Sequence, residues 1–146
     1  MILHKHKVVV GSLLLFFGCL CTAQVGIKTV PIKNVDPSSG EKMYVTYCGA
    51  CHGTDGKGTG PAATAMKALP TDLTTLAKRN NGKFPALHVQ QTIRGDTAMP
   101  AAHGTKDMPV WGNLFSSLTR GDTITQAEVE QRVVNLTTYV QLLQQR

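Results

Sequence analysis

Two cysteines and a histidine stand together in one short motif, Cys48-Gly49-Ala50-Cys51-His52. Residues three and four apart lie on the same side of a helical turn, because an α-helix has about 3.6 residues per turn. Both sulfurs can therefore form thioethers to one edge of a porphyrin while the imidazole of His52 reaches the iron. A C-x-x-C-H run is the signal for covalent attachment of a c-type haem.

Two other uses of a C-x-x-C pair fit this chain less well. A thioredoxin-like redox pair needs a βαβ context, and a structural zinc site needs a further pair of ligands. The only other cysteines, Cys19 and Cys21, fall in an apolar leader that export would remove. The motif therefore favours haem over zinc or thiol exchange.

Residues 1–23 have the layout of a secretory signal peptide. Two lysines form a basic start, an almost wholly apolar run extends to Cys21, and small residues precede a cleavage site after Ala23. The apolar run is shorter than the about 20 residues that a bilayer-spanning helix needs, so cleavage is favoured over an uncleaved anchor. We expect a mature domain of residues 24–146 in the periplasm.

Cys19 leaves a second form of processing open. Phe16-Phe17-Gly18-Cys19 loosely matches the bacterial lipoprotein pattern, in which the cysteine receives lipid and becomes the new N-terminus. The small residue before the cysteine fits this pattern, whereas Phe16 stands where leucine is usual. Cleavage before Cys19 would anchor the protein to a membrane surface.

The charge and composition of the mature segment limit the kinds of partner that we expect it to bind. Loss of the two lysines in the leader lowers the formal charge by two, from +6 to +4. A mildly basic exported protein favours acidic docking surfaces, and such association weakens as salt rises. No basic run with interleaved aromatic residues occurs, so nucleic acid is not an expected partner. Aromatic residues make up only 5% of the chain, and a buried haem would supply much of the apolar volume that the core needs.

Helices must position the motif, because no strand-like alternation occurs along the chain. Residues 24–35 lack a period and predict an extended arm. Asp36-Pro37-Ser38-Ser39 is a helix-start signal, which predicts a first helix over about 38–47 that leads into Cys48. Gly40 on this helix permits the close approach of another helix.

Two shorter helices are predicted in the middle of the chain. Pro70-Thr71-Asp72-Leu73 starts one that ends near Arg79, and Pro85 starts another that Gly95 ends. Residues 62–69 form a short helix or remain a loop.

A glycine-rich loop follows the motif and ends at Pro61. Its glycines suit a chain folded tightly against a flat ligand, where side chains would be in the way. The carbonyl of Pro61 can accept a hydrogen bond from the second ring nitrogen of His52, an anchor that an axial histidine usually has. A phosphate cradle is rejected, because the loop has no Gly-Lys-Ser/Thr and no preceding strand is evident.

The C-terminal segment has the clearest helical pattern. Thr125-Gln126-Ala127-Glu128 is a capping box, and apolar residues recur behind it at helical spacing. Together with the earlier start signals, this helix predicts an all-α domain. Its apolar positions are Val129, Val133, Leu136, Val140 and Leu143.

The segment from 95 to 113 is long and has no period, and such a loop in a compact domain is usually functional. It carries Met99, His103 and Met108, which are candidates for a second axial ligand, as is His88 on the preceding helix. Met99 and Met108 each precede a proline. A proline keeps the residue before it extended, and it has no backbone N–H to donate. Both properties suit a loop that presses on a haem face.

Met108 is the preferred ligand. Trp111 and Gly112 follow it, so a large flat group and a flexible residue stand where packing on the macrocycle is needed. Trp111 either packs on the haem or donates its indole proton to a propionate. Met99 is then apolar filler in the loop, because methionine commonly fills irregular gaps. Three alternatives remain for the sixth position of the iron: Met99 binds there, a histidine binds there, or the position is open.

Taken together, these pieces resemble class I mono-haem bacterial cytochromes c from about residue 38 to residue 145. The resemblance implies the cytochrome c fold, in which the first and last helices cross and shorter helices and long loops surround one haem. It also implies that the carbonyl of Pro61 orients His52 and that Met108 is the sixth ligand. The matching pieces are Gly40 with Tyr44, the C-x-x-C-H motif, Gly58-Thr59-Gly60-Pro61, Met108-Pro109-Val110-Trp111-Gly112, and Leu136 with Tyr139.

Ligation by His52 and Met108 saturates the iron and leaves no position for substrate or dioxygen. The thioether sulfur favours the reduced state and raises the reduction potential relative to bis-histidine ligation. We therefore expect an electron-transfer protein and not an enzyme, with redox proteins as donor and acceptor. Two other functions stay open: a haem sensor or peroxidase-like protein if Met108 does not bind, and a tethered haem subunit of a larger dehydrogenase or oxidase.

Overall fold

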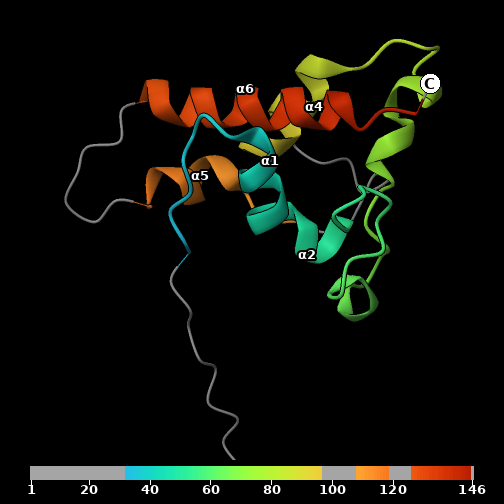
Figure 1. Ribbon diagram of the computed structural model, residues 1–146, viewed down its shortest axis with the longest axis horizontal. Helices are drawn as coiled ribbons and strands as arrows, with labels where there is room; N and C mark the ends of the chain where they lie inside the picture. Colours follow the sequence, from blue (N-terminus) through green and yellow to red (C-terminus); the bar gives the residue numbers. More distant parts are fainter. Residues whose placement is uncertain (1–31, 97–107, 119–125, 146) are drawn as a thin grey trace, which may run out of the picture. The chain divides into compact units, whose positions relative to one another are not determined.

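Helices are the regular secondary structure of the computed structural model, which describes residues 32–96, 108–118 and 126–145 (Figure 1). No strand occurs within these ranges, and the prediction of an all-α fold is confirmed. The described residues belong to one unit, 31–146. The predicted leader, with its cleavage site and Cys19, lies outside the described residues.

The predicted first helix begins at Gly40 and continues through His52, beyond the end predicted from sequence. Ser39 caps its start, because the Ser39 hydroxyl accepts a hydrogen bond from the backbone N–H of Lys42 at 3.2 Å. The helix consists of three pieces joined end to end. They are α1 (Gly40–Met43), the π turn η1 (Tyr44–Cys48) and α2 (Gly49–His52).

The π turn sets the direction of the C-x-x-C-H motif. In it the backbone N–H of Gly49 bonds to the carbonyl of Tyr44, five residues earlier. Such a turn holds one residue more than an α turn, so it rotates the helix that follows by roughly 100°. The side chains of Cys51 and His52 therefore point in a direction that differs from the one an unbroken α-helix would give them.

The remaining described residues form short helical pieces and one long helix. The predicted helices before Arg79 and before Gly95 are present, and of residues 62–69 only three are helical. Within the described ranges, no helix has the length and apolar character needed to cross a bilayer. The pieces are η2 (Ala63–Ala65), η3 (Leu73–Thr75), α3 (Leu76–Arg79), α4 (Ala86–Arg94), α5 (Trp111–Ser116) and α6 (Gln126–Leu142).

Two helices begin at positions that differ from the sequence-based expectation or adjoin residues outside the described ranges. The expectation of a loop over 95–113 is wrong at its end, where α5 begins at Trp111; residues 97–107 lie outside the described residues. The capping box was predicted to start at Thr125, which also lies outside them, and α6 begins at the next residue.

α1 and α6 cross at very short range. A Cβ atom on Gly40 would lie 2.3 Å from the backbone oxygen of Asn135, so a glycine is needed for the two backbones to approach this closely. Further along the two segments, the rings of Tyr44 and Tyr139 pack with their centroids 5.2 Å apart. The predicted crossing of the first and last helices is confirmed.

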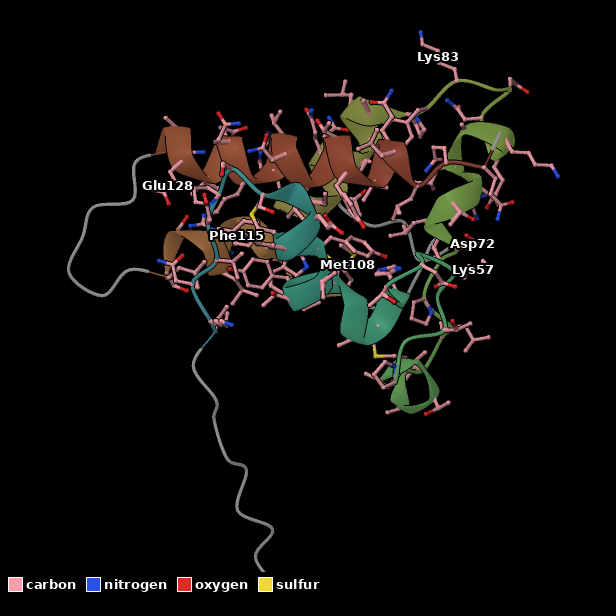
Figure 2. The ribbon with its side chains drawn as sticks, viewed as in Figure 1. Lys57, Asp72, Lys83, Met108, Phe115 and Glu128 are labelled. Atoms are coloured by element: carbon pink, nitrogen blue, oxygen red, sulfur yellow. The ribbon has the colours of Figure 1, made fainter. Side chains whose placement is uncertain are left out.

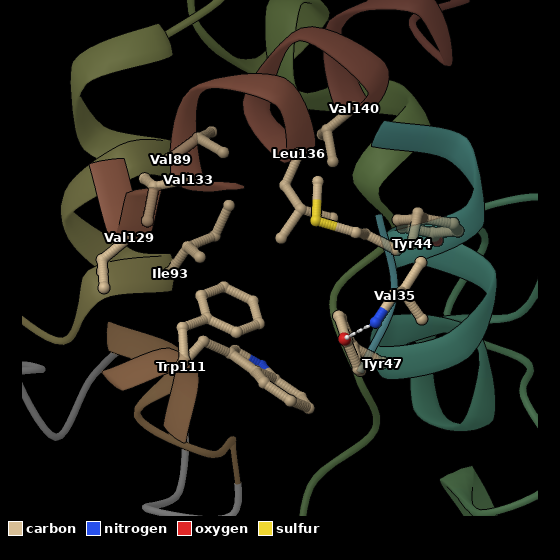
Figure 3. Packing of buried hydrophobic residues seen from close by; sticks show 12 residues of the cluster. Val35, Tyr44, Tyr47, Val89, Ile93, Trp111, Val129, Val133, Leu136 and Val140 are labelled. Carbon is tan, nitrogen blue, oxygen red and sulfur yellow. Dashed lines mark hydrogen bonds between the residues drawn. The ribbon is translucent and has the colours of Figure 1, made fainter. Parts of the chain in front are cut away.

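The hydrophobic core lies where α6 packs on α1, α4 and α5 (Figures 1 and 3). Trp111 and Phe115 of α5 and Tyr47 of η1 form an aromatic cluster, with ring centroids 5.4 to 5.7 Å apart. Four apolar residues of α6 that share the predicted helical spacing are buried: Val129, Val133, Leu136 and Val140.

One charged side chain is buried with this apolar face. Arg132 of α6 is only 1% exposed, and its guanidinium donates to the carbonyl of Val35 at 2.6 Å and to the amide oxygen of Asn34 at 3.0 Å. The Tyr47 hydroxyl accepts from the N–H of Val35 at 3.1 Å and donates to the carbonyl of Lys33 at 2.8 Å (Figure 3). Buried donors thus hold the described part of the N-terminal arm, which the sequence did not indicate.

Candidate functional site

The two cysteines of the motif are free thiols, and both are partly buried. Cys48 ends the π turn and Cys51 lies in α2, three positions further along the same helical chain. Residues at this spacing are neighbours on a helix surface. Cys48 also packs against the hydrophobic core. Two thiols at this spacing, one of them packed against the apolar core, fit attachment to a flat apolar group.

The environment of Cys48 does not favour a reactive thiolate. Burial raises the pKa of the Cys48 thiol to about 12, and the neighbouring Cys51 adds to this effect. Redox-active and catalytic cysteines need the opposite, a lowered pKa. Among the residues that the structure describes, no three His, Cys, Asp or Glu side chains gather where a metal ion could bind. The raised pKa of Cys48 therefore argues against thiol exchange by this pair.

His52 is the last residue of α2 and is partly buried. Its Nδ1 lies 3.0 Å from the carbonyl oxygen of Thr71, so Nδ1–H donates and Nε2 keeps its lone pair. Burial lowers the pKa of His52, although the hydrogen bond to Thr71 acts in the opposite direction. The ring is therefore neutral at pH 7, which is the form that binds a metal ion.

The structure assigns the anchor of His52 to Thr71 and not to Pro61, the acceptor predicted from sequence. Pro61 is exposed. The chain beside it turns back along the motif, because the N–H of Gly60 donates to the carbonyl of Cys51 at 3.0 Å. Sequence reasoning missed Thr71 because a backbone carbonyl has no residue signature. Its only trace was the Pro-Thr-Asp-Leu run, which predicted a helix start.

Glycines let the loop after the motif pack against the segment that carries Thr71. Gly58 has φ +80°, and a Cβ atom there would lie 2.2 Å from the carbonyl oxygen of Pro70. Next to this contact, the N–H of Leu73 donates to the carbonyl of Gly56 at 2.7 Å. The loop is folded tightly, as predicted. In the structure it packs against the backbone on either side of Thr71, whereas the sequence predicted packing against a flat ligand.

Tyr44 also contacts the C-terminal end of the motif. Its hydroxyl donates to the carbonyl of Gly53, directly after His52, at 2.9 Å. The side chain is fully buried, and burial raises the pKa of Tyr44, so the hydroxyl keeps its proton and remains a donor. Tyr44 therefore belongs to the core, and its hydroxyl links the core directly to the end of the C-x-x-C-H motif.

Met108 is partly buried and packs against the hydrophobic core (Figure 2). The chain just after it is held against the end of α4. A Cβ atom on Gly95 would lie 2.4 Å from the Cγ1 atom of Val110, and one on Gly112 would lie 2.6 Å from the carbonyl oxygen of Arg94. The segment that carries Met108 is thus fixed by two close approaches, while its pairing with His52 across a haem stays a prediction.

The other candidate residues differ in where the structure places them. Trp111 is buried between Tyr47 and Phe115, which gives it a packing role; a contact with a propionate stays a prediction. His88, a candidate ligand from the sequence, is exposed on α4. The alternative ligands Met99 and His103 lie outside the described residues.

The chain matches one family model, described as cytochrome c oxidase, cbb3-type, subunit III, over residues 35–125. The match covers more than half of the chain and includes the C-x-x-C-H motif, Thr71 and Met108. Comparisons with curated proteins and with solved structures found no match. The chain therefore belongs to the family of cytochrome c oxidase, cbb3-type, subunit III, and its helical domain is that of a c-type cytochrome.

Proposed function

We propose that this protein is an exported mono-haem cytochrome that carries single electrons between redox proteins. Cys48 and Cys51 would hold the haem through thioethers, and His52 and Met108 would bind its iron. A haem bound here supplies a one-electron couple between ferric and ferrous iron. The observation that best supports the proposal is the hydrogen bond that fixes the ring of His52 through Nδ1 on the carbonyl of Thr71, next to Cys48 and Cys51 in the same motif.

The residues of this chain would tune the iron and limit its chemistry. With Met108 as sixth ligand, no coordination position remains for a substrate, so the protein acts as a carrier and not as an enzyme. Cys48 and Met108 both pack against the apolar core. Apolar surroundings disfavour the extra positive charge of ferric iron, and they raise the reduction potential together with the methionine sulfur.

Substitution of the two loop methionines tests the ligand assignment. Met108→Ala should abolish the far-red sulfur-to-iron band of the ferric protein and allow carbon monoxide to bind, with haem still attached. Met99→Ala is the matched control, because it removes the same side chain before a proline in the same loop, and it should leave the spectrum intact. The reverse result would make Met99 the ligand, and a wild-type protein that lacks the far-red band would favour a histidine.

The family description favours a second candidate, in which the protein is a tethered haem subunit of a larger oxidase. Size-exclusion chromatography and co-purification from membranes separate the two functions. A free carrier runs as a small protein, and its association with an acidic partner weakens as salt rises. A subunit stays with a membrane complex under the same salt conditions.

The predicted leader bears on both candidates. We propose that residues 1–23 are removed on export and that residues 24–146 act in the periplasm, with lipid attachment at Cys19 as the alternative. Mass spectrometry of the mature N-terminus distinguishes a chain that starts at Gln24 from one that starts at a lipid-bearing Cys19.

A further inference from the structure

Gln144 follows α6 and is partly buried. Its side-chain nitrogen donates to the carbonyl of Leu73 at 2.7 Å and to the carbonyl of Val140 at 2.8 Å. Its side-chain oxygen accepts from the backbone N–H of Ala77 at 2.9 Å. Because the donor side meets two carbonyls and the acceptor side meets an N–H, only one orientation of the amide satisfies all three bonds.

These bonds fix the segment that begins just after Thr71. Leu73 and Ala77 are the first residue of η3 and the second residue of α3, so the two contacts hold both short helices. The backbone N–H of Gln145 adds a third contact, with the carbonyl of Thr74 at 2.9 Å. The end of α6 therefore holds the segment from Leu73 to Ala77 at three points.

Thr71 and Leu73 also contact the C-x-x-C-H motif and the loop that follows it. Thr71 presents its carbonyl to Nδ1 of His52 at 3.0 Å. Leu73 is bonded at both ends of its backbone, because its N–H donates to Gly56 in the loop after the motif while its carbonyl accepts from Gln144. A short path of hydrogen-bonded backbone thus connects the amide of Gln144 with the ring of His52.

We propose, on the basis of the function proposed above, that Gln144 is a positioning residue for the axial ligand His52. By fixing Leu73 and Ala77, it holds the carbonyl of Thr71 where it accepts the Nδ1–H bond. An accepted Nδ1–H bond makes imidazole a stronger donor to iron and fixes the orientation of its ring. Loss of the Gln144 amide should therefore weaken the hydrogen bond from Nδ1–H of His52 to Thr71. The imidazole then becomes a weaker donor to iron, which favours the ferrous state.

Two substitutions of Gln144 test the proposal in the haem-loaded protein. Gln144→Glu keeps the shape of the side chain but turns an oxygen toward two carbonyls, and Gln144→Ala removes all three bonds. Gln141→Glu is the control, because it makes the same change of charge three positions earlier, at an exposed position in the last turn of α6. The readouts are the solvent exchange of the His52 Nδ1 proton, followed by NMR in the ferrous protein, and the reduction potential.

Both Gln144 variants should exchange the Nδ1 proton about tenfold faster than the wild type and have a higher reduction potential, as expected for a weakened hydrogen bond. The Gln141→Glu variant should match the wild type in both. A lower melting temperature with unchanged exchange would give Gln144 a structural role only and overturn the proposal.

The following outcomes decide the test without reference to the stability of the variants. Rapid exchange of the Nδ1 proton in the wild-type protein overturns the role of Gln144 even if both variants fail to fold. A protein that takes up no haem overturns the proposed function, and the role of Gln144 with it. A haem-loaded protein with unchanged exchange in the variants overturns the role of Gln144 alone.

Discussion

His52 depends on a residue far from its own motif. The C-x-x-C-H run predicts that the imidazole binds iron, but the acceptor that orients the ring is the backbone of Thr71, nineteen positions later in the chain. Any residue type can supply a backbone carbonyl, so composition and spacing cannot identify it. Asp72, directly after Thr71, caps η3 and stabilises the turn that presents this carbonyl.

Asp72 provides a prediction with a defined pH dependence. Its carboxylate accepts hydrogen bonds from the hydroxyl of Thr74 at 2.6 Å and from the N–H of Thr74 at 2.8 Å, and these bonds lower the pKa of Asp72. We expect Asp72→Ala to lower the free energy of unfolding at pH 7 by about 1 kcal/mol, as loss of a helix cap usually does.

The effect of Asp72→Ala should shrink in acid. A carboxyl group whose folded pKa is lowered stabilises the fold above its unfolded pKa, and this stabilisation is lost as the pH falls through the folded value. The difference in unfolding free energy between the variant and the wild type should therefore decrease below the ordinary value of 3.8. Denaturant unfolding at about pH 7 and about pH 3 measures it. An equal difference at both pH values would contradict the role given to the carboxylate.

At the scale of elements, a helix was predictable where a start signal, a stop residue or a long apolar period marked it. α4 ends at Gly95 in the left-handed conformation, and α6 buries four of the five residues that its spacing indicated. The fifth, Leu143, follows the end of the helix and is partly buried. α5 was missed because its six residues are too few for a repeated period and no side chain caps its start. Its stability comes from the burial of Trp111 and Phe115, which depends on the rest of the fold.

The crossing of α1 and α6 makes a prediction about two glycines. Gly40→Ala places a methyl group 2.3 Å from the backbone oxygen of Asn135, so the helices must separate. We expect the free energy of unfolding to fall by about 1–3 kcal/mol, the usual cost of an overpacked contact. Chemical denaturation of the haem-loaded protein measures this loss.

Gly49→Ala is the matched control for this crossing. Gly49 has ordinary right-handed helical backbone angles, and a Cβ atom there would have no neighbour closer than 3.7 Å. Alanine is favoured over glycine in a helix by about 0.5–1 kcal/mol, so this variant should be neutral or more stable than the wild type. Similar losses in both variants would show that the close approach at Gly40 is not the cause.

At the scale of the whole molecule, Arg132 joins parts of the chain that are far apart in sequence. Its guanidinium bonds to Asn34 and Val35 in the arm, pairs with Glu128 on α6 at 3.0 Å, and lies 5.9 Å from the ring centroid of Phe115 on α5. Sequence reasoning missed Arg132 because its acceptors lie nearly a hundred positions away. A charged residue in an amphipathic helix is normally expected to face solvent.

Arg132→Met tests this role. Methionine retains the length and apolar contacts of the side chain, but the buried carbonyl of Val35 loses its donor. We expect the free energy of unfolding to fall by about 1–3 kcal/mol, the cost of an unsatisfied buried polar group, and hydrogen exchange at Val35 to become faster.

Gln131→Met is the control for this substitution, because Gln131 is an exposed neighbour on α6. It should change stability by less than about 0.5 kcal/mol, as most surface substitutions do. Faster exchange at Val35 in the Gln131→Met variant as well would show that Arg132 does not specifically hold the arm.

One covalently attached haem is required by every function proposed for this protein. The intact mass of the protein, measured under denaturing conditions after maturation in a host that attaches c-type haem, tests this directly. We predict a mass increase equal to one haem, with neither Cys48 nor Cys51 available to a thiol-alkylating reagent. An unchanged polypeptide mass with both thiols free to react would contradict it.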